Sequence, residues 1–305
     1  MGLSRTTVNV FVGCCSSAFL MEILMARKPS SANLVTFLQF FFITLYGFIA
    51  TTKFGSVGPK IPLKQYIILV ALFFVTTVAN NYVYALHVPS TLHMIIRSAS
   101  SPASMLVYCC VKKQLPKLNN AVGSVLISVG VALAMYGGAP TDEENKGTFL
   151  YWCIGVTILL ATLITGAFTG IQQERLYSRY GKHPNEMLFY THAIPMPVFL
   201  GIYPQLMDTS AGLAWDTWML IALNILSQFY CTHSVHELAT KETSVTVTFI
   251  LTVRKFLSLL LSSIVFKNSL SLYHVIGTVL VAIGTYVYFD FFTSKRQGPV
   301  TMKNK

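Results

Sequence analysis

Charged residues are scarce in this sequence, and the motifs of metal and redox chemistry are missing from it. Charged residues make up 11% of the 305 residues, against 53% hydrophobic residues, and the mean hydropathy is +0.59. No C-x-x-C spacing occurs among the six cysteines, and no H-E-x-x-H pattern occurs among the seven histidines. This composition predicts an all-α integral membrane protein with no cofactor and no bound metal.

The cysteines are expected to serve as packing residues. All six lie inside apolar stretches, where a cysteine behaves as a small apolar side chain. We therefore expect neither a disulfide nor a metal site from Cys14, Cys15, Cys109, Cys110, Cys153 and Cys231.

Long apolar stretches recur along the chain. Each is about 18 to 25 residues long, enough to cross a hydrocarbon core roughly 30 Å thick. The first stretch lacks a strong basic start and runs past signal length, so we expect it to remain in the protein. Pro89 lies between the third and fourth stretches, which leaves a nine-span alternative open. The ten predicted transmembrane spans are residues 7–26, 33–52, 65–86, 91–111, 119–137, 149–173, 186–206, 215–238, 244–266 and 272–292.

Lysines and arginines are distributed unevenly between the two sides of the predicted membrane. If the N-terminus is cytosolic, fifteen of these cations lie in cytosolic connections and four lie on the other side. The side with four cations also carries the acidic stretch TDEEN at residues 141–145. This asymmetry predicts that both termini are cytosolic. It also attributes the net charge of +11 to topology in a lipid bilayer rather than to nucleic-acid binding.

The chain contains a repeat. Residues 123–133 read GSVLISVGVAL and residues 277–287 read GTVLVAIGTYV, and an arginine precedes each copy in the span before it. Spans four and five therefore resemble spans nine and ten. A repeat of five spans inserts its two copies with opposite orientations, as in many secondary transporters. We predict one membrane domain built from two inverted five-helix repeats, residues 1–140 and 141–305, with the glycines as close-packing faces between helices.

Three cations lie deep in predicted spans: Arg97, Arg254 and Lys255. A charged side chain at this depth costs about 2.5 to 3.5 kcal/mol on insertion scales. Of the eleven acidic residues, only Glu22 lies more than about one turn inside a span. The excess positive charge favours an anionic substrate, with phosphate contacts from the three cations. The alternative is structural pairing, or a water-filled cavity with no ligand.

Glu22 is the natural partner of one cation when the cavity is empty, so we expect it to act in gating. The competing interpretation is a carboxylate near enough to the span end to reach water. If the two repeats are inverted copies, Arg97 and Arg254 should face one central cavity at similar depth.

Polar side chains accompany the deep cations. Some recur at helical spacing and bridge helices in the simplest interpretation, whereas amides and tyrosines offer hydrogen bonds and rings to a base or sugar. The predicted base or sugar contacts from these residues are Asn80, Asn81, Tyr82, His93, Gln228, Tyr230, Thr252 and Ser258.

Six stretches together resemble the nucleotide-sugar transporters of the drug/metabolite transporter superfamily, and most closely the UDP-N-acetylglucosamine/UDP-xylose transporter group. The resemblance covers nearly the whole chain. The stretches that carry it are GCCSSAFLMEIL at 13–24, NLVTFLQF at 33–40, NNYVYAL at 80–86, LHMIIRSAS at 92–100, ERLYSRYGKHPNEMLFYTHAIPMP at 174–197 and TSVTVTFILTVRKFLSLLLS at 243–262.

The resemblance implies ten helices in the Golgi or endoplasmic reticulum membrane and exchange of a cytosolic UDP-sugar for lumenal UMP. It implies that Lys255 contacts phosphate, with Arg254 beside it. Residues 189–192, FYTH, stand in place of the family's F-Y-N-N nucleobase motif, which adds Tyr190 and His192 to the predicted base contacts. The two amides of that motif are associated with guanine recognition in GDP-mannose carriers, so their replacement leans toward UDP-sugars.

Other functions remain as alternatives. Another anionic nucleotide or metabolite could be carried on the same fold, whereas export of amino acids or drugs would leave the deep cations unexplained. A membrane-embedded transferase needs clustered carboxylates or a histidine–acid pair and larger loops than these connections of about a dozen residues. A scaffold or receptor would likewise leave the buried charge unexplained. A homodimer is compatible with the sequence.

Overall fold

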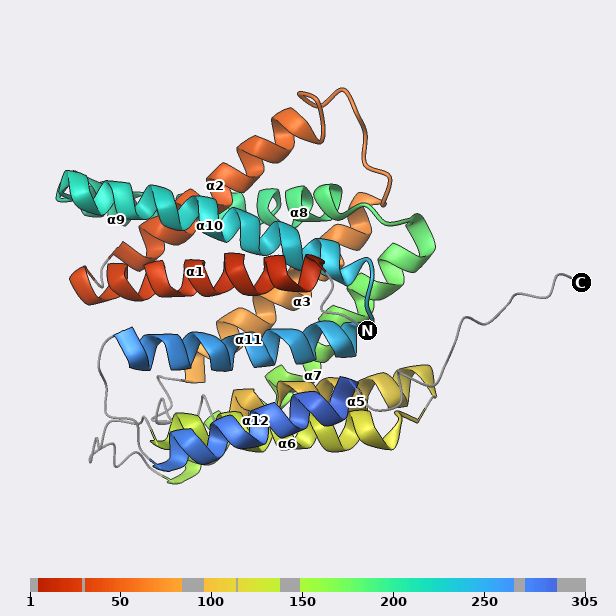
Figure 1. Ribbon diagram of the computed structural model, residues 1–305. Coiled ribbons are helices and arrows are strands. Elements are labelled where there is room, and N and C mark those ends of the chain that lie inside the picture. The colour runs from red at the N-terminus through yellow and green to blue at the C-terminus, as the bar shows by residue number, and fades with distance from the viewer. Residues whose placement is uncertain are drawn as a thin grey trace, which may run out of the picture. The chain divides into compact units, whose positions relative to one another are not determined.

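A computed structural model describes residues 5–28, 31–83, 96–113, 115–137, 149–265 and 272–289. Its regular elements in these ranges are helices, and no strand occurs among them (Figure 1). The helices are α1 (Arg5–Arg27), α2 (Ala32–Ala50), α3 (Leu63–Tyr82), α5 (Ser100–Lys112), α6 (Leu118–Gly137), α7 (Phe149–Tyr180), α8 (Pro184–Ala193), the 3₁₀ helix η3 (Met196–Ile202), α9 (Tyr203–Ala211), α10 (Trp215–Ala239), α11 (Ser244–Val265) and α12 (Leu272–Phe289).

The predicted all-α class is confirmed for the described residues. Helices α1, α2, α6, α10 and α11 coincide with predicted spans to within two residues at each end. By length and apolarity, α1, α2 and the Cys153–Tyr180 part of α7 are long enough to cross a membrane, and shorter apolar helices include Leu118–Leu133 and Val275–Tyr288. The count of ten spans and the full inverted repeat stay predictions.

The predicted span over residues 186–206 is not one unbroken α-helix in the structure. Helix α8 starts with Pro184 at its first turn and ends at Ala193, and the chain continues through a turn into η3 and α9. Pro195 and Pro197 lie at this break. A proline inside a helix lacks the N–H donor and clashes with the preceding turn, so hydrophobicity alone did not continue the helix here.

The chain forms two compact units. Of the described residues, the first unit contains 80–83, 96–113, 115–137, 149–167 and 272–289, and the second contains 5–28, 31–79 and 168–265. Each unit thus combines segments from both halves of the sequence. Compact units are defined by packing contacts, whereas repeats are defined by similarity of sequence. The units therefore do not test the predicted repeat boundaries at residues 140 and 141, which stay a prediction.

The first unit is built around the pair α6 and α12. A Cβ atom added to Gly123 would lie 2.7 Å from the carbonyl oxygen of Gly284, and one added to Gly130 would lie 2.8 Å from that of Gly277. The prediction that these glycines form a close-packing face is confirmed. The contacts are also symmetric, because the repeat relates 123 to 277 and 130 to 284, and this exchange converts one contact into the other. Two helices that run antiparallel and carry glycines seven residues apart produce this pattern.

In the second unit, α1 and α10 lie side by side and run antiparallel (Figure 1). At one end, Lys241 Nζ donates to Glu237 Oε1 at 2.6 Å and to Thr6 Oγ1 at 2.7 Å. At the other end, Arg27 and Asp216 form an ion pair at 2.9 Å. Polar contacts therefore fix the register of the two helices at both ends of the pair.

A disulfide joins Cys14 of α1 to Cys231 of α10, so the expectation that all six cysteines are packing residues is wrong. Close approach of the helices is the reason. A Cβ on Gly13 would lie 3.0 Å from the backbone nitrogen of Cys231, and the Cα atoms of the bonded cysteines are 4.5 Å apart. The two cysteines are 217 residues apart, and no local spacing motif reports a pairing of that kind.

A buried carboxylate anchors the connection between α2 and α3. Glu186 of α8 is 8% exposed, and its Oε1 accepts hydrogen bonds from the backbone N–H groups of Lys60 and Ile61 at 2.9 and 3.0 Å and from Tyr66 Oη at 2.9 Å. The ring of Tyr66 stacks on Tyr190 with 4.6 Å between centroids. This contact set holds α3, α8 and the preceding connection together within the second unit.

Candidate functional site

A cavity of about 190 Å³ lies within the second unit, between α1, α2, α10 and α11. Its lining combines apolar and polar side chains. The lining residues are Cys14, Ser17, Ala18, Met21, Gln39, Gln228 and Arg254. Two predicted substrate contacts, Gln228 and Arg254, therefore meet in one cavity, although 26 residues separate them in the chain.

Arg254 supplies the charge of this cavity. Its NH1 group donates to the carbonyl oxygen of Cys14 at 3.5 Å, which is the outer limit of a hydrogen bond. Its Nε atom is buried and has no hydrogen-bond partner. Among the buried partnerless side-chain atoms of the described residues, this is the one that belongs to a charged group. A buried donor of this kind is costly unless a ligand satisfies it, and a guanidinium suits phosphate or carboxylate oxygens.

A chain of amides and one hydroxyl borders the same cavity. Gln39 Nε2 donates to Asn224 Oδ1 at 2.6 Å, and Asn224 Nδ2 donates to the carbonyl oxygen of Ser17 at 2.9 Å. Ser17 Oγ donates to Gln228 Oε1 at 2.6 Å. Asn224 is completely buried, and Ser17 is 4% exposed. Three helices thus share one connected hydrogen-bond network, which we call the amide relay.

The other predicted residues of α11 have separate surroundings. Lys255 is half-buried and is not part of the cavity lining. Thr252 is 2% exposed, and its hydroxyl donates to the carbonyl oxygen of Thr248 at 2.9 Å. Ser258 Oγ donates to Cys15 Sγ at 3.4 Å, which is a contact between α11 and α1. Their predicted roles in substrate binding stay predictions.

The predicted aromatic and histidine contacts pack within the second unit. Tyr190 stacks on Tyr66, as described above. His192 Nδ1 lies 2.8 Å from the carbonyl oxygen of Leu188, and its ring lies 4.7 Å from that of Phe40, the neighbour of the cavity residue Gln39. Tyr230 is 42% exposed and packs over Gly13 of α1. None of these three tyrosine and histidine side chains belongs to the lining of the described cavity.

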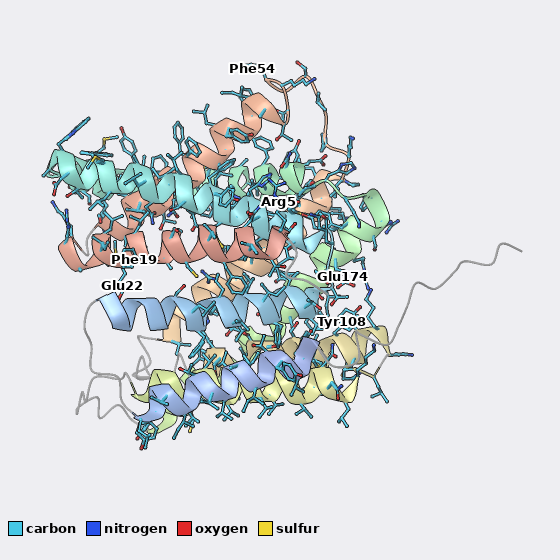
Figure 2. All side chains as sticks on the ribbon, in the orientation of Figure 1. Arg5, Phe19, Glu22, Phe54, Tyr108 and Glu174 are labelled. Carbon is cyan, nitrogen blue, oxygen red and sulfur yellow. A yellow bond between two sulfur atoms is a disulfide. The ribbon has the colours of Figure 1, made fainter. Side chains whose placement is uncertain are left out.

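The remaining predicted residues lie elsewhere or outside the described part of the chain. Arg97 is exposed and belongs to the first unit, so its predicted cavity with Arg254 stays a prediction. Glu22 is exposed on α1, toward the end opposite Arg5 (Figure 2). The side chains of Asn80, Asn81 and Tyr82 at the end of α3 lie outside the described part of the structure, and so does the whole of His93.

Sequence reasoning did not identify Ser17, Gln39 and Asn224 as site residues. A signal was available, because Gln39 and Asn224 are amides inside stretches that are otherwise apolar, and a buried amide needs partners. The partners lie 185 and 207 residues away, so the pattern of one helix does not report them.

Comparison with known proteins shows the family to which this helical protein belongs. Residues 4–291 match the UAA transporter family, and the chain belongs to that family. The chain is 38% identical to the UDP-xylose and UDP-N-acetylglucosamine transporter of Danio rerio, over 93% of each chain. It is 37% identical to the endoplasmic reticulum GDP-fucose transporter of Drosophila melanogaster, over 94% of this chain and 90% of the relative. It is 35% identical to the nucleotide sugar transporter SLC35B4 of Homo sapiens, over 93% of each.

The fold also matches a crystal structure. The TM-score is 0.67 over 96% of this chain and 100% of the other, at 14% sequence identity. At this identity the likeness supports the fold alone. The family match and the named relatives confirm the resemblance to nucleotide-sugar transporters.

Proposed function

We propose that this protein carries a UDP-sugar, UDP-N-acetylglucosamine or UDP-xylose or both, from the cytosol into the lumen of the Golgi or endoplasmic reticulum. The counter-substrate is UMP, and a site between two inverted repeats opens alternately to each side of the membrane. Family membership and the names of the relatives from Danio rerio and Homo sapiens support the class of substrate.

The observation that carries the proposal is the half-buried side chain of Arg254, whose Nε atom is buried. Its Nε donor has no partner, and none of the described residues that line its cavity is a carboxylate. An anion is the ligand that offsets this charge, and a diphosphate offers several oxygens to one guanidinium. Lys255 follows in sequence and adds a second cation about 100° around the same helix.

A GDP-sugar is the second candidate, because the relative from Drosophila melanogaster is named as a GDP-fucose transporter. The geometry of α8 supports a UDP-sugar instead. Thr191 Oγ1 donates to the carbonyl oxygen of Met187 at 2.7 Å, and His192 Nδ1 pairs with that of Leu188. These side chains are occupied by their own helix and present no amide for the edge of guanine.

The experiment is counterflow in proteoliposomes with a panel of labelled nucleotide sugars, including GDP-fucose. Uptake of a UDP-sugar into vesicles preloaded with UMP should greatly exceed uptake into empty vesicles, because few deep carboxylates are present to couple transport to protons. Equal uptake in both, or loss of uptake on adding a protonophore, would contradict the proposed exchange. Preference for GDP-fucose would select the second candidate.

Variants of the deep cations test the site. Arg254→Ala and Lys255→Ala should each abolish exchange while the protein remains inserted, and Lys255→Arg should restore little, because a planar fork does not replace a compact charge. The matched control is Arg175→Ala, which removes an exposed arginine of α7. Normal exchange by Arg254→Ala would contradict the assignment of this cavity.

A further inference from the structure

The amide relay has one orientation. The carbonyl oxygen of Ser17 accepts hydrogen bonds and does not donate them, so the atom of Asn224 that contacts it at 2.9 Å is the amide nitrogen. The other end of the Asn224 amide is then its oxygen. That oxygen contacts Gln39 at 2.6 Å, so Gln39 presents its NH₂ group to Asn224. A single backbone carbonyl thereby sets the direction of both amides.

The consequence is a fixed acceptor at the cavity. With its NH₂ group directed to Asn224, Gln39 keeps its carbonyl oxygen for a ligand. Gln228 is arranged the other way, because its oxygen accepts from Ser17 Oγ at 2.6 Å and its NH₂ group stays available. Arg254 adds the partnerless Nε donor. The lining therefore offers donors from Gln228 and Arg254 and one oriented acceptor from Gln39.

These two donors and one acceptor together require a ligand with two properties. It must carry an oxygen that accepts from Arg254 and Gln228, and a hydroxyl or N–H that donates to Gln39. A phosphate alone satisfies the donors but would repel the carbonyl oxygen of Gln39. The ligand group at Gln39 is therefore an uncharged hydroxyl or N–H close to the phosphate.

The volume of the cavity indicates which part of a nucleotide sugar it can hold. Pockets for whole ligands of drug size span about 300 to 1,000 Å³, and this cavity has about 190 Å³. A volume of this size accommodates one ring and an adjoining group, and the rest of a nucleotide sugar would extend beyond it. The nucleobase is separated from the diphosphate by the ribose, and the ribose is bonded at two ends. The transported sugar is bonded directly to the phosphate and ends there, so it fits a cavity that also contains a phosphate-binding arginine.

We propose that the cavity between α1, α2, α10 and α11 holds the sugar of the nucleotide sugar, and that the oriented carbonyl oxygen of Gln39 accepts a hydrogen bond from a sugar hydroxyl or acetamido N–H. This inference rests on the proposed function. Gln39 is a specificity-determining residue, and Asn224 is a positioning residue that acts through Gln39. Arg254 binds the phosphate to which the sugar is attached.

The test compares the binding of UMP, UDP-xylose and UDP-N-acetylglucosamine to purified full-length protein and variants. Gln39→Met keeps the length of the side chain and removes the acceptor. Loss of one neutral hydrogen bond should weaken binding of the UDP-sugars about three- to ten-fold, whereas UMP, which has no transported sugar, should bind as it does to the unmodified protein. The matched control is Gln172→Met on α7, a glutamine that donates to Gln65 at 3.2 Å and does not line the cavity. It should bind all three ligands normally.

A double-mutant cycle tests the positioning role of Asn224. If Asn224→Ala weakens UDP-sugar binding by releasing Gln39, then adding Gln39→Met should weaken it little further, because the two changes remove the same contact. Unchanged UMP binding by each variant shows that the cavity unit is still folded. Additive losses in the double variant would contradict the positioning role.

The outcomes separate this inference from the proposed function. If the unmodified protein binds no nucleotide sugar, the proposed function fails and this inference fails with it. If it binds UDP-sugars and Gln39→Met weakens UMP equally, the cavity holds the ribose or base, and the sugar assignment alone is overturned. If Gln39→Met changes no affinity, the amide relay is purely structural and the assignment is again overturned.

Discussion

Removal of the Glu186 carboxylate is expected to destabilise the second unit strongly. One oxygen of this side chain accepts three hydrogen bonds, from the backbone of Lys60 and Ile61 and from Tyr66 Oη. Ile61 and Tyr66 are completely buried, so water does not replace the lost acceptor for those two donors without rearrangement. A hydrogen bond to a charged group contributes about 1.5 to 3 kcal/mol. Two buried donors therefore set a loss of about 3 to 6 kcal/mol for Glu186→Ala.

Companion variants divide this loss among the contacts. Tyr66→Phe removes one hydrogen bond and should cost about 1.5 to 3 kcal/mol. Glu186→Gln keeps an acceptor at the same place but removes the charge, so it should fall between the unmodified protein and Glu186→Ala. The exposed Asp208 of α9 provides the control, because Asp208→Ala removes a carboxylate at the surface and should change stability by less than about 0.5 kcal/mol.

The assay is reversible denaturant unfolding of the purified protein in detergent micelles, followed by circular dichroism. A double-mutant cycle between Glu186→Ala and Tyr66→Phe should give less than the sum of the single effects, because both remove the same hydrogen bond. Since Tyr66 stacks on Tyr190, nucleotide binding should weaken along with stability if Tyr190 contacts the base. A change in unfolding free energy below about 0.5 kcal/mol for Glu186→Ala would refute the reasoning.

Two further predictions concern helix packing. Gly123→Leu should separate α6 from α12, because its Cβ would lie 2.7 Å from the carbonyl oxygen of Gly284, and overpacking costs about 1 to 3 kcal/mol; Val129→Leu, at an exposed position of α6, should be neutral in the same unfolding assay. Alkylation without reduction, followed by proteolysis and mass spectrometry, should recover a linked peptide that contains Cys14 and Cys231, and recovery of both as alkylated thiols would contradict the disulfide.

The sequence by itself determined the class of the protein and much of its local structure. Scarce charge and long apolar stretches are averages over many neighbouring residues, so they predict helix positions without knowledge of packing. The glycine spacing was sufficient to predict which helix faces pack together. Gly123, Gly130, Gly277 and Gly284 repeat at one interval in two helices, and a face of small residues identifies its own packing surface. The cost of a deep charge predicted Arg254 as a substrate contact, and the structure places this residue in the lining of a cavity.

Only the tertiary structure decided how distant segments meet. Two contacts join helices that are far apart in the sequence and share no local motif: the Cys14–Cys231 disulfide and the hydrogen bond of Gln39 with Asn224. The break after α8 lies between these two cases. Pro195 and Pro197 are present in the sequence and disfavour a continuous helix, but the apolar average of the segment led to a prediction of one span. The orientation of the Gln39 amide depends on a backbone carbonyl of another helix, and hydrogen-bond direction is a property of three-dimensional contact rather than of residue type.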